Sequence, residues 1–359
     1  MQQGVTTIQR FIAEEHRRIP GAAGELAALL ADLVGCIRII ASSVERAALP
    51  GAVTAAGDGV ENVHGERQTK LDVLANEVIL RGCEWSGALA AMASEELELP
   101  YPIPTRFPRG KYLLAFDPLD GSSNLDVNVS VGTIFSVLRR RGSGPTIAPE
   151  ELLQPGVNQV CAGYAIYGPS TMIVLTFGRG VHGFTLDRCV GEFVLTHPNM
   201  RIPDEAREFA INASNQRFWE LPVKRYVSEC LAGRTGPRAA DFNMRWVASL
   251  VAEVHRILVR GGLFLYPRDT KEPARAGRLR LLYEASPMAM IVEAAGGAAS
   301  TGRQRILDVL PTDVHARVPV ILGSRAEVER VERYHREHEQ GKGEPYRSPL
   351  FNARSLFIE

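Results

Sequence analysis

Eight consecutive residues, Asp117 to Asn124, constrain this chain of 359 residues more than any other segment. They read Asp-Pro-Leu-Asp-Gly-Ser-Ser-Asn and follow an apolar, strand-like run from Tyr112 to Phe116. The proline fixes a corner between the two aspartates, while the glycine and serines can turn successive backbone N–H groups inward to bind an anion. Because carboxylate oxygens are ligands that Mg2+ prefers, the octet predicts a metal and phosphate site. An isolated Asp-Pro or Asp-Gly pair would more often serve only the geometry of a turn.

Length and composition describe an ordinary globular protein with a large core. The chain is 45% apolar and carries 41 basic and 41 acidic residues, so no net charge favours nucleic acid as a partner. The segment 196–204 is polar and contains Pro198 and Pro203, which makes it the best internal boundary. We therefore expect an N-terminal domain over residues 1–200 and a C-terminal domain over residues 201–359.

The sequence also predicts a cytoplasmic protein without a membrane partner. Residues 14–18 are charged where a signal peptide would need an apolar core, and the apolar stretch 26–41 is interrupted by Asp32 and Arg38 and is too short to span a bilayer. The cysteines are odd in number, lack CxxC pairs and are expected to be reduced. They are Cys36, Cys83, Cys161, Cys189 and Cys230.

Hydrophobic periodicity predicts an αβ pattern after opening helices. Leucines at helical spacing predict a core-facing helix over residues 24–41. Runs of β-branched and aromatic residues predict strands over 112–116, 130–138, 171–177 and 192–195. In the second half we expect helices over 244–259 and 287–295 and strands over 263–266 and 279–284. Ser324 and Glu327 predict a capping box for a late charged helix, on which His335 and His338 are expected to face solvent.

Several acidic residues outside the octet have structural interpretations when their patterns are taken alone. Ser94, Glu95 and Glu96 have the pattern of a helix N-cap followed by acids that favour the positive end of the helix dipole. Thr69 and Asp72 have the spacing of a capping box. On these patterns alone, both segments would be structural.

The run 278–284 leaves two interpretations open. If it is a strand, Arg278, Arg280 and Glu284 lie on one face, because alternate residues of a strand share a side. That face is either the solvated side of an edge strand or a phosphate-binding wall that ends at a metal. Arginine suits the second function because its planar donors can grip two phosphate oxygens.

The octet and four further segments together resemble the metal-dependent sugar phosphatases, and class I fructose-1,6-bisphosphatase in particular. The resemblance runs from about residue 8 to residue 325, and the serine pair and asparagine of the octet separate it from the inositol monophosphatases. It implies an α/β fold in five αβαβα layers, a homotetramer, and two or more Mg2+ per subunit, with Mn2+ as a substitute. It also implies hydrolysis of the 1-phosphate of D-fructose 1,6-bisphosphate by a metal-activated water, in gluconeogenesis or the Calvin cycle. The further segments are 70–76, 94–96, 245–247 and 261–284.

The resemblance also assigns roles to individual residues. Asp72 and Glu96 would orient and deprotonate the attacking water. The metals would be held by Glu95, Asp117, the Leu119 carbonyl, Asp120 and Glu284. The 1-phosphate would lie in the nest formed by Asp120, Gly121, Ser122 and Ser123. The remote 6-phosphate would meet Asn212, Tyr266 and Arg245, the last from a neighbouring subunit, and the sugar side would meet Trp246, Arg278 and Arg280.

Electrostatics agree with the metals that the resemblance implies. Two carboxylates about 4 Å apart repel each other by roughly 4 kcal/mol at an effective dielectric constant of about 20. A cluster of ionised carboxylates therefore needs cations to form.

Two residues depart from the family pattern. Trp246 stands where the family usually has tyrosine, and Arg278 where it usually has lysine. Because the resemblance places both positions on the substrate side, a sedoheptulose-1,7-bisphosphatase or a dual-specificity enzyme is the nearest alternative. An inactive phosphosugar-binding regulatory protein is the alternative from another class, and the presence of every metal ligand speaks against it.

The resemblance finally suggests an AMP site in the first domain. It would comprise Gly24, Glu25, Leu26, Lys111, Tyr112 and Arg139. Ala23 and Ala27, however, occupy positions where threonine hydroxyls usually bind the phosphate. Each hydrogen bond lost to a charged group costs roughly 1.5 to 3 kcal/mol, so we expect AMP inhibition to be weak or absent.

Overall fold

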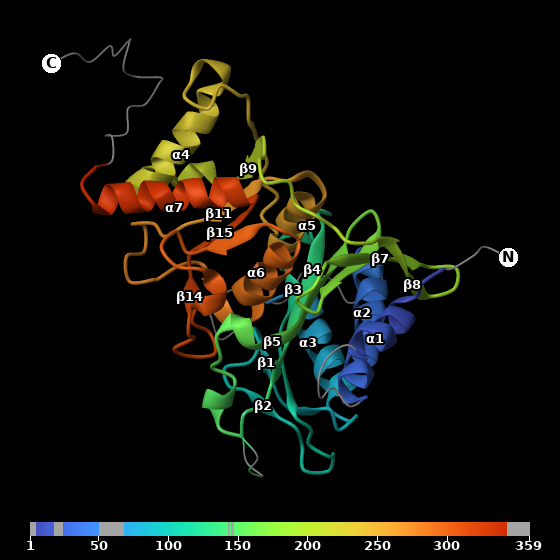
Figure 1. Cartoon of the computed structure of the whole chain (residues 1–359). Helices are drawn as coiled ribbons and strands as arrows, with labels where there is room; N and C mark the ends of the chain where they lie inside the picture. Colours follow the sequence, from blue (N-terminus) through green and yellow to red (C-terminus); the bar gives the residue numbers. More distant parts are fainter. Residues whose placement is uncertain (1–4, 18–23, 50–67, 143, 145–146, 343–359) are drawn as a thin grey trace.

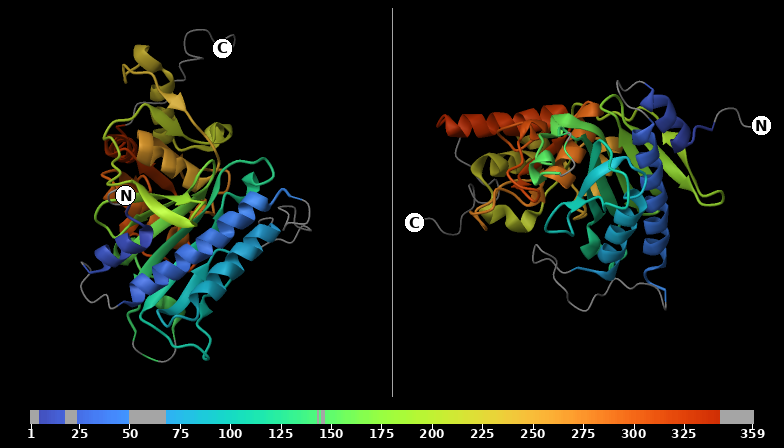
Figure 2. Two further views of the ribbon diagram at one scale, coloured as in Figure 1. Left: turned by 90° about the vertical axis from the view of Figure 1, so that its right-hand side faces the viewer. Right: turned by 90° about the horizontal axis from the view of Figure 1, so that it is seen from below.

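Three helices near the N-terminus form the first layer of the structure, a computed structural model that describes residues 5–17, 24–49, 68–142, 144 and 147–342. They are α1 (Ile8–His16), α2 (Glu25–Arg46) and α3 (Lys70–Cys83). The helical spacing of apolar residues turns one face of α2 toward α3 and the first sheet, so that Leu26, Leu29 and Leu33 are fully buried. Figures 1 and 2 show α2 and α3 side by side on this face of the sheet.

The second layer is an eight-stranded sheet with the order β2-β1-β3-β4-β5-β6-β7-β8. β1 and β3 are parallel, and the other neighbours are antiparallel. The strands are β1 (Leu89–Ser94), β2 (Tyr101–Pro102), β3 (Tyr112–Asp120), β4 (Val131–Arg139), β5 (Gln159–Tyr167), β6 (Thr171–Thr176), β7 (His182–Asp187) and β8 (Glu192–His197). The strands predicted at 112–116, 130–138, 171–177 and 192–195 are thus confirmed as parts of β3, β4, β6 and β8.

A β-bulge near the end of β3 decides how the octet presents its carboxylates. Asp117 pairs with Ile134 and Asp120 with Gly132, so three steps along β3 oppose two steps along β4. In a regular strand, residues three apart point to opposite faces. The extra residue corrects this alternation, and both aspartates reach the same point.

Two helices separate the first sheet from the second. They are α5 (Leu250–Arg260) and α6 (Ser286–Ala294). The second sheet has the order β10-β9-β11-β15-β13, and a separate ribbon pairs β12 with β14. These strands are β9 (Glu208–Ala210), β10 (Asn243–Met244), β11 (Leu263–Tyr266), β12 (Leu279–Arg280), β13 (Ala298–Ser300), β14 (Arg317–Val318) and β15 (Val320–Gly323).

The last layer comprises α4 (Leu221–Leu231) and α7 (Arg325–Glu339), which cover the outer face of the second sheet. Figure 2 shows α7 on the opposite side of the molecule from α2 and α3. The five αβαβα layers implied by the resemblance are therefore present.

One apolar core joins the two halves of the chain. Ile134 and Tyr164 of the first sheet pack in the same cluster as Val251 of α5 and Ile291 of α6. All four side chains are fully buried. This cluster joins strands of the first sheet to helices from the second half of the chain.

The strand predicted over 279–284 is wrong after its second residue. β12 ends at Arg280, and the chain continues as a π-helical turn over Leu281–Ala285 that runs into α6. Pro287 at the start of α6 favours a helix start, and π-helical turns are frequent at functional sites. Arg280 and Glu284 still meet, but through a helical turn instead of a shared strand face.

Two expectations about the ends of elements also need correction. Ser324 does not cap α7 through its side chain and instead accepts a hydrogen bond from Gly262 N at 3.2 Å. Its predicted partner Glu327 is buried and binds Tyr226 and Arg238. The helix predicted from residue 244 begins only at Leu250, because the preceding residues form β10 and a loop.

His335 does not face solvent as predicted, whereas His338 does. In the described part of the chain, neither ring nitrogen of His335 has a hydrogen-bond partner, and burial lowers its pKa to about 4. The prediction failed because the neighbours of His335 in the sequence are charged, which is typical of an exposed helix face.

α2 is longer than predicted, with 22 residues where the sequence suggested a helix that ends near residue 41. The prediction that this helix is too short to span a bilayer is therefore wrong, because among the described helices it is long and apolar enough to do so by length and composition. Its buried face packs in the core with α3 and the first sheet, as a core helix does.

Candidate active site

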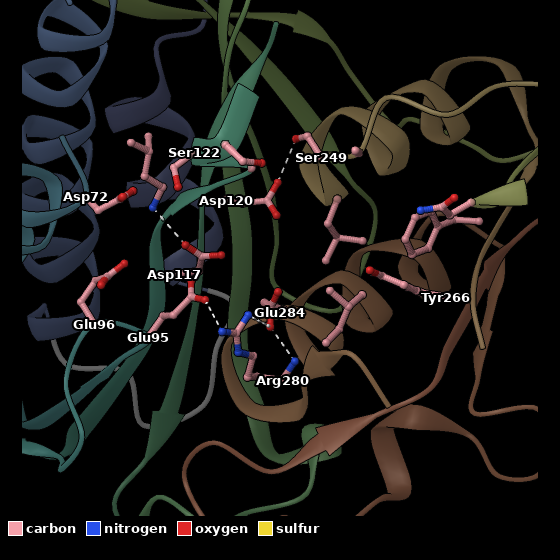
Figure 3. A pocket seen from close by; sticks show the side chains of 18 of the residues that line it. Asp72, Glu95, Glu96, Asp117, Asp120, Ser122, Ser249, Tyr266, Arg280 and Glu284 are labelled. Atoms are coloured by element: carbon pink, nitrogen blue, oxygen red, sulfur yellow. Dashed lines mark hydrogen bonds and ion pairs between the residues drawn. The ribbon is translucent and has the colours of Figure 1, made fainter. Parts of the chain in front are cut away.

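A cavity of about 480 Å3 opens between the octet, the start of α3, the start of α5 and the second sheet. Figure 3 shows its side chains, with the acidic residues at one end and Tyr266 at the other. Most of the predicted site residues line it. They are Asp72, Glu95, Glu96, Asp117, Leu119, Asp120, Gly121, Ser122, Ser123, Asn212, Trp246, Tyr266, Arg280 and Glu284.

Three carboxylates form the centre of the acidic end. Ligand oxygens of Asp117, Asp120 and Glu284 lie within 4.8 Å of one another, and all three residues are buried. Burial raises the pKa of Asp117 well above its ordinary value, and the charges of Glu95, Asp120 and Glu284 raise it further. Burial likewise raises the pKa of Glu284 to about 8, although Arg280 opposes the shift. The site therefore favours a cation.

Hydrogen bonds from the start of α5 anchor Asp120. Its Oδ2 atom accepts from Ser249 Oγ and from Val251 N, each at 2.9 Å. Burial raises the pKa of Asp120, while these two donors oppose the shift. The second half of the chain thus fixes a carboxylate that belongs to the octet.

Arg280 lies among the acids and supplies part of the missing positive charge. Its Nη2 atom is 2.7 Å from Glu95 Oε1, and its Nη1 atom is 3.7 Å from Glu284 Oε2. Its backbone N–H also donates to Glu284 Oε2 at 2.5 Å. One guanidinium cannot neutralise four neighbouring carboxylates, and the buried oxygen donors have the chemistry that Mg2+ prefers. The residues therefore fit a divalent cation.

Asp72 combines the two roles that the sequence left as alternatives. It closes a capping box with Thr69, whose N–H donates to Asp72 Oδ2 at 2.6 Å. It also lines the cavity and is hydrogen-bonded to Ser122. Burial raises its pKa, and the Thr69 and Ser122 hydrogen bonds oppose the shift. Helix capping thus holds this carboxylate at the edge of the site.

Glu96 faces the same end of the cavity, and Gln68 Nε2 donates to its Oε2 atom at 2.6 Å. No helix begins at Ser94, contrary to the N-cap pattern. Residues 95 and 96 form a turn after β1, in which Glu96 N donates to Ser94 Oγ at 3.2 Å. A turn at a strand end lets both glutamates approach the octet.

Gly121 gives the octet its sharp change of direction. Its φ of +74° lies in the left-handed region, and a Cβ atom there would stand 2.9 Å from the Ser249 side chain. The next three residues, Ser122–Asn124, form a short 3-10 helix. Glycine is therefore required here both by backbone conformation and by the close approach of α5.

Aromatic side chains form the far end of the cavity. Trp246 stacks on Phe264 with ring centroids 6.1 Å apart, and it meets Tyr266 edge-on at 5.9 Å. Asn212 caps the short helix over Ala213–Phe218 through its Oδ1 atom. This end combines apolar ring faces with polar groups, as a sugar-binding surface does.

Two predicted substrate residues do not line this cavity. The Arg245 side chain is 48% exposed and lies 3.9 Å from Glu208. Arg278 is paired with Glu272 at 2.6 Å and with Asp269 at 3.6 Å. The expectation that Arg278 shares a strand face with Arg280 and Glu284 is therefore wrong, because β12 comprises only Leu279 and Arg280, so Arg278 precedes the strand and Glu284 follows it in a helical turn.

Comparison with known proteins identifies the family. The model of the fructose-1-6-bisphosphatase N-terminal domain matches residues 6–198, and the model of the C-terminal domain matches residues 202–336. The chain belongs to the class 1 fructose-1,6-bisphosphatases.

Relatives match it over nearly their whole length. A class 1 fructose-1,6-bisphosphatase of Methylibium petroleiphilum is 58% identical over 356 residues, which are 99% of this chain and 98% of that protein. One of Hydrogenophilus thermoluteolus is 59% identical over 351 residues, 98% and 97% of the two chains. The crystal structure of Leishmania major fructose-1,6-bisphosphatase in holo form matches with a TM-score of 0.85 and 37% identity, over 93% of this chain and 99% of that one.

The residues suggested for AMP binding in this fructose-1,6-bisphosphatase lie at the start of α2, at the start of β3 and at the end of β4. Lys111 Nζ is 3.2 Å from Glu25 Oε2 and lies over the Tyr112 ring, and Tyr112 pairs with Arg139 across β3 and β4. Gly24 precedes α2, and Leu26 is fully buried. Ala27 packs against the core, whereas Ala23 lies outside the described residues.

Sequence reasoning missed several residues of this fructose-1,6-bisphosphatase site. Ser249 and Gln68 hold the acids, and Phe264 supports Trp246. Ser249 had a usable signal, because a serine directly before an apolar helical run predicts an N-cap. Gln68 and Phe264 had none, since their importance comes only from contacts distant in sequence.

Proposed function

We propose that this chain hydrolyses the 1-phosphate of D-fructose 1,6-bisphosphate and releases D-fructose 6-phosphate and inorganic phosphate. The observation that supports this function is the buried cluster of Asp117, Asp120 and Glu284 at one end of a cavity with an aromatic and polar far end. Such a cavity suits a sugar with two phosphates, one at each end. Membership of the class 1 family supports the same substrate.

The predicted ligands suit two or more Mg2+ ions, with Mn2+ as a substitute. Asp117, Asp120 and Glu284 would hold them, together with Glu95 and the Leu119 carbonyl. When bound, the metal ions neutralise phosphate oxygens and make a bound water more acidic.

The residues of the chain itself position the reactants. We assign binding of the 1-phosphate to the backbone N–H groups and hydroxyls of the segment 121–123, which lines the cavity beside Asp120. Asp72 and Glu96 face the same end and would hold the attacking water and accept its proton. Tyr266 and Asn212 would bind the 6-phosphate, while Arg280 and Trp246 contact the sugar side.

Sedoheptulose 1,7-bisphosphate is the second candidate substrate. Arg278 is held away from the cavity by Glu272 and Asp269, so it does not crowd the sugar side. Trp246 presents an indole N–H where the family usually presents a phenol. The pairing of Arg278 outside the cavity leaves room for a longer sugar, while the exchange at Trp246 changes the hydrogen-bond donor that the sugar meets. An inactive phosphosugar-binding role has less support, because every predicted metal ligand lines the cavity.

Release of inorganic phosphate from a panel of substrates tests these functions. With Mg2+ present, fructose 1,6-bisphosphate should give the highest kcat/KM, and inositol monophosphate should serve as the negative control. A higher kcat/KM for sedoheptulose bisphosphate would transfer the assignment to that sugar. Phosphate release from neither bisphosphate would exclude both enzymatic assignments and leave the binding role.

We further propose a cytoplasmic homotetramer in which Arg245 enters the active site of a neighbouring subunit. Its exposed side chain, which does not line the cavity of its own chain, supports this assignment. Mixing Arg245→Ala and Asp120→Asn subunits tests it, because a residue that acts between subunits restores activity in the hybrid. The absence of complementation in verified hybrids would place Arg245 outside the neighbouring site. The five free cysteines fit a reducing compartment, and the domains 1–200 and 201–359 remain our prediction.

A further inference from the structure

The segment 246–249 connects the remote end of the cavity to the start of α5 and lies between β10 and this helix without regular secondary structure. Trp246, Ala248 and Ser249 line the cavity. Ala248 has a φ of +63°, in the left-handed region that residues with a Cβ atom enter only at an energetic cost. Such a conformation persists only where neighbouring groups fix it.

Two side chains hold this segment from opposite sides. Glu253 accepts a hydrogen bond from Val247 N at 2.5 Å, and it also binds the backbone N–H of Ala248. Asn124 Nδ2 donates to the Ala248 carbonyl at 3.1 Å and reaches the Val247 carbonyl at 3.5 Å. Both N–H groups and both carbonyls of two consecutive residues are therefore bound by side chains.

Glu253 has no part in the chemistry assigned above and is nevertheless a buried acid. Its side chain is 1% exposed, in the first turn of α5. Burial raises its pKa to about 7, whereas the N–H groups of Val247 and Ala248 and the charge of Arg256 oppose the shift. The Arg256 guanidinium is bound to Glu208 at 2.8 Å. The main partners of the Glu253 carboxylate are thus the backbone N–H groups of Val247 and Ala248.

Asn124 links this segment to the metal site, because it is the last residue of the octet. Asp120, four residues earlier, accepts from Ser249 Oγ and Val251 N at 2.9 Å. The octet therefore contacts the segment at two points, and Glu253 holds its other side. A shift of the octet relative to α5 would break contacts at both points.

We propose that Glu253 and Asn124 are positioning residues that clamp the segment 246–249, so that the remote end of the substrate is bound at a fixed distance from the metal end. Trp246 belongs to this segment and packs on Phe264 and Tyr266. Loosening the clamp therefore displaces the aromatic surface at the remote end while leaving the carboxylate ligands on their own elements. The inference rests on the proposed bisphosphatase function and adds residues that touch neither substrate nor metal.

Equilibrium binding separates the two ends of the cavity. The product fructose 6-phosphate occupies the remote end, and inorganic phosphate occupies the metal end. In calorimetry with Mg2+, Glu253→Gln should raise the Kd of fructose 6-phosphate by about tenfold, the effect of one hydrogen bond lost from a charged acceptor. The Kd of inorganic phosphate should change less than about twofold. KM for the bisphosphate should rise in parallel, while kcat falls less.

Glu327→Gln is the matched control. Glu327 is an equally buried glutamate that binds Tyr226 and Arg238 away from the cavity. Neutralising it should lower Tm without changing the Kd of fructose 6-phosphate. Asn124→Ala removes the opposite side of the clamp at a partly exposed position, and it keeps the test available if Glu253→Gln does not fold. It should also raise the Kd of fructose 6-phosphate selectively.

Two results would overturn the clamp. One is unchanged fructose 6-phosphate binding in both clamp variants. The other is an equal loss of binding for product and inorganic phosphate that follows the loss of Tm, as in a general structural defect. A wild-type protein that neither binds fructose 6-phosphate nor hydrolyses a bisphosphate would refute the proposed function itself, so the two failures are distinguishable.

Discussion

The raised pKa of Glu284 predicts that metal affinity increases with pH. Its pKa is about 8 in the folded protein against an ordinary value of 4.5, chiefly because the carboxyl group is buried. A metal ion binds the carboxylate and must displace the proton. With a pKa of about 8, about one molecule in ten is deprotonated at pH 7 and about nine in ten at pH 9. Apparent Mg2+ affinity should therefore rise about tenfold over this range.

Mg2+ titration of bisphosphatase activity at pH 7, 8 and 9 measures the effect, and direct Mn2+ binding provides a readout independent of turnover. Calorimetry in buffers of different ionisation enthalpy should show that protons are released on metal binding at pH 7. Glu253→Gln should retain the full pH dependence, because Glu253, although its pKa is also raised, to about 7, lies outside the cavity. Glu284→Gln should lower the affinity and reduce the number of protons released, and the raised pKa of Asp117 accounts for the release that remains.

The same shift fixes the sign of a stability effect. A carboxyl group whose pKa is raised by folding stabilises the protein fully below its ordinary pKa of 4.5, and this contribution is lost as the pH rises toward about 8. The metal-free protein should therefore lose Tm between pH 5 and pH 8, and Mg2+ should restore more of it at the higher pH. A half-saturating Mg2+ concentration that is the same at pH 7 and pH 9, without proton release, would refute this reasoning.

Three further outcomes are expected. Asp120→Asn, which weakens the metal cluster and the anchoring by Ser249, should abolish turnover, and undiminished wild-type activity in chelator would contradict metal dependence. Asp72→Ala should lower kcat strongly and leave bisphosphate binding intact, and the lost capping box should cost about 1 kcal/mol of stability. If kcat falls no more than the fraction of folded protein, Asp72 has only the capping role. AMP should inhibit a saturated assay weakly or not at all because Ala27 offers no hydroxyl, and inhibition at micromolar AMP would show that other groups bind its phosphate.

The sequence predicted most of the site because its chemistry is concentrated in short segments. The octet predicted a carboxylate site and a turn at its glycine, and in the structure the carboxylates of Asp117 and Asp120 lie close together. The β-bulge that makes this possible could not be predicted, because it depends on pairing with β4. No local pattern indicated Gln68 or Phe264, which act through contacts with distant segments.

The wrong predictions share a physical cause. In each case a local sequence pattern suggested one structure, but contacts with distant segments determine the structure that forms. Alternation at 278–284 suggested a continuous strand, but only Leu279 and Arg280 pair with β14 before the chain enters a helical turn. Ser324 and Glu327 had the spacing of a capping box, but both side chains are used by other elements. His335 sits on a charged helix, yet its position on the buried face of α7 removes it from water.

The core shared by the two halves has a consequence for synthesis on the ribosome. Ile134 and Tyr164 emerge long before Val251 and Ile291, the residues that cover them. The growing chain must therefore keep an apolar sheet face exposed until nearly 300 residues have been translated. Glu284 follows Asp117 and Asp120 by more than 160 residues, so the three-carboxylate cluster cannot assemble on a nascent chain that ends before it.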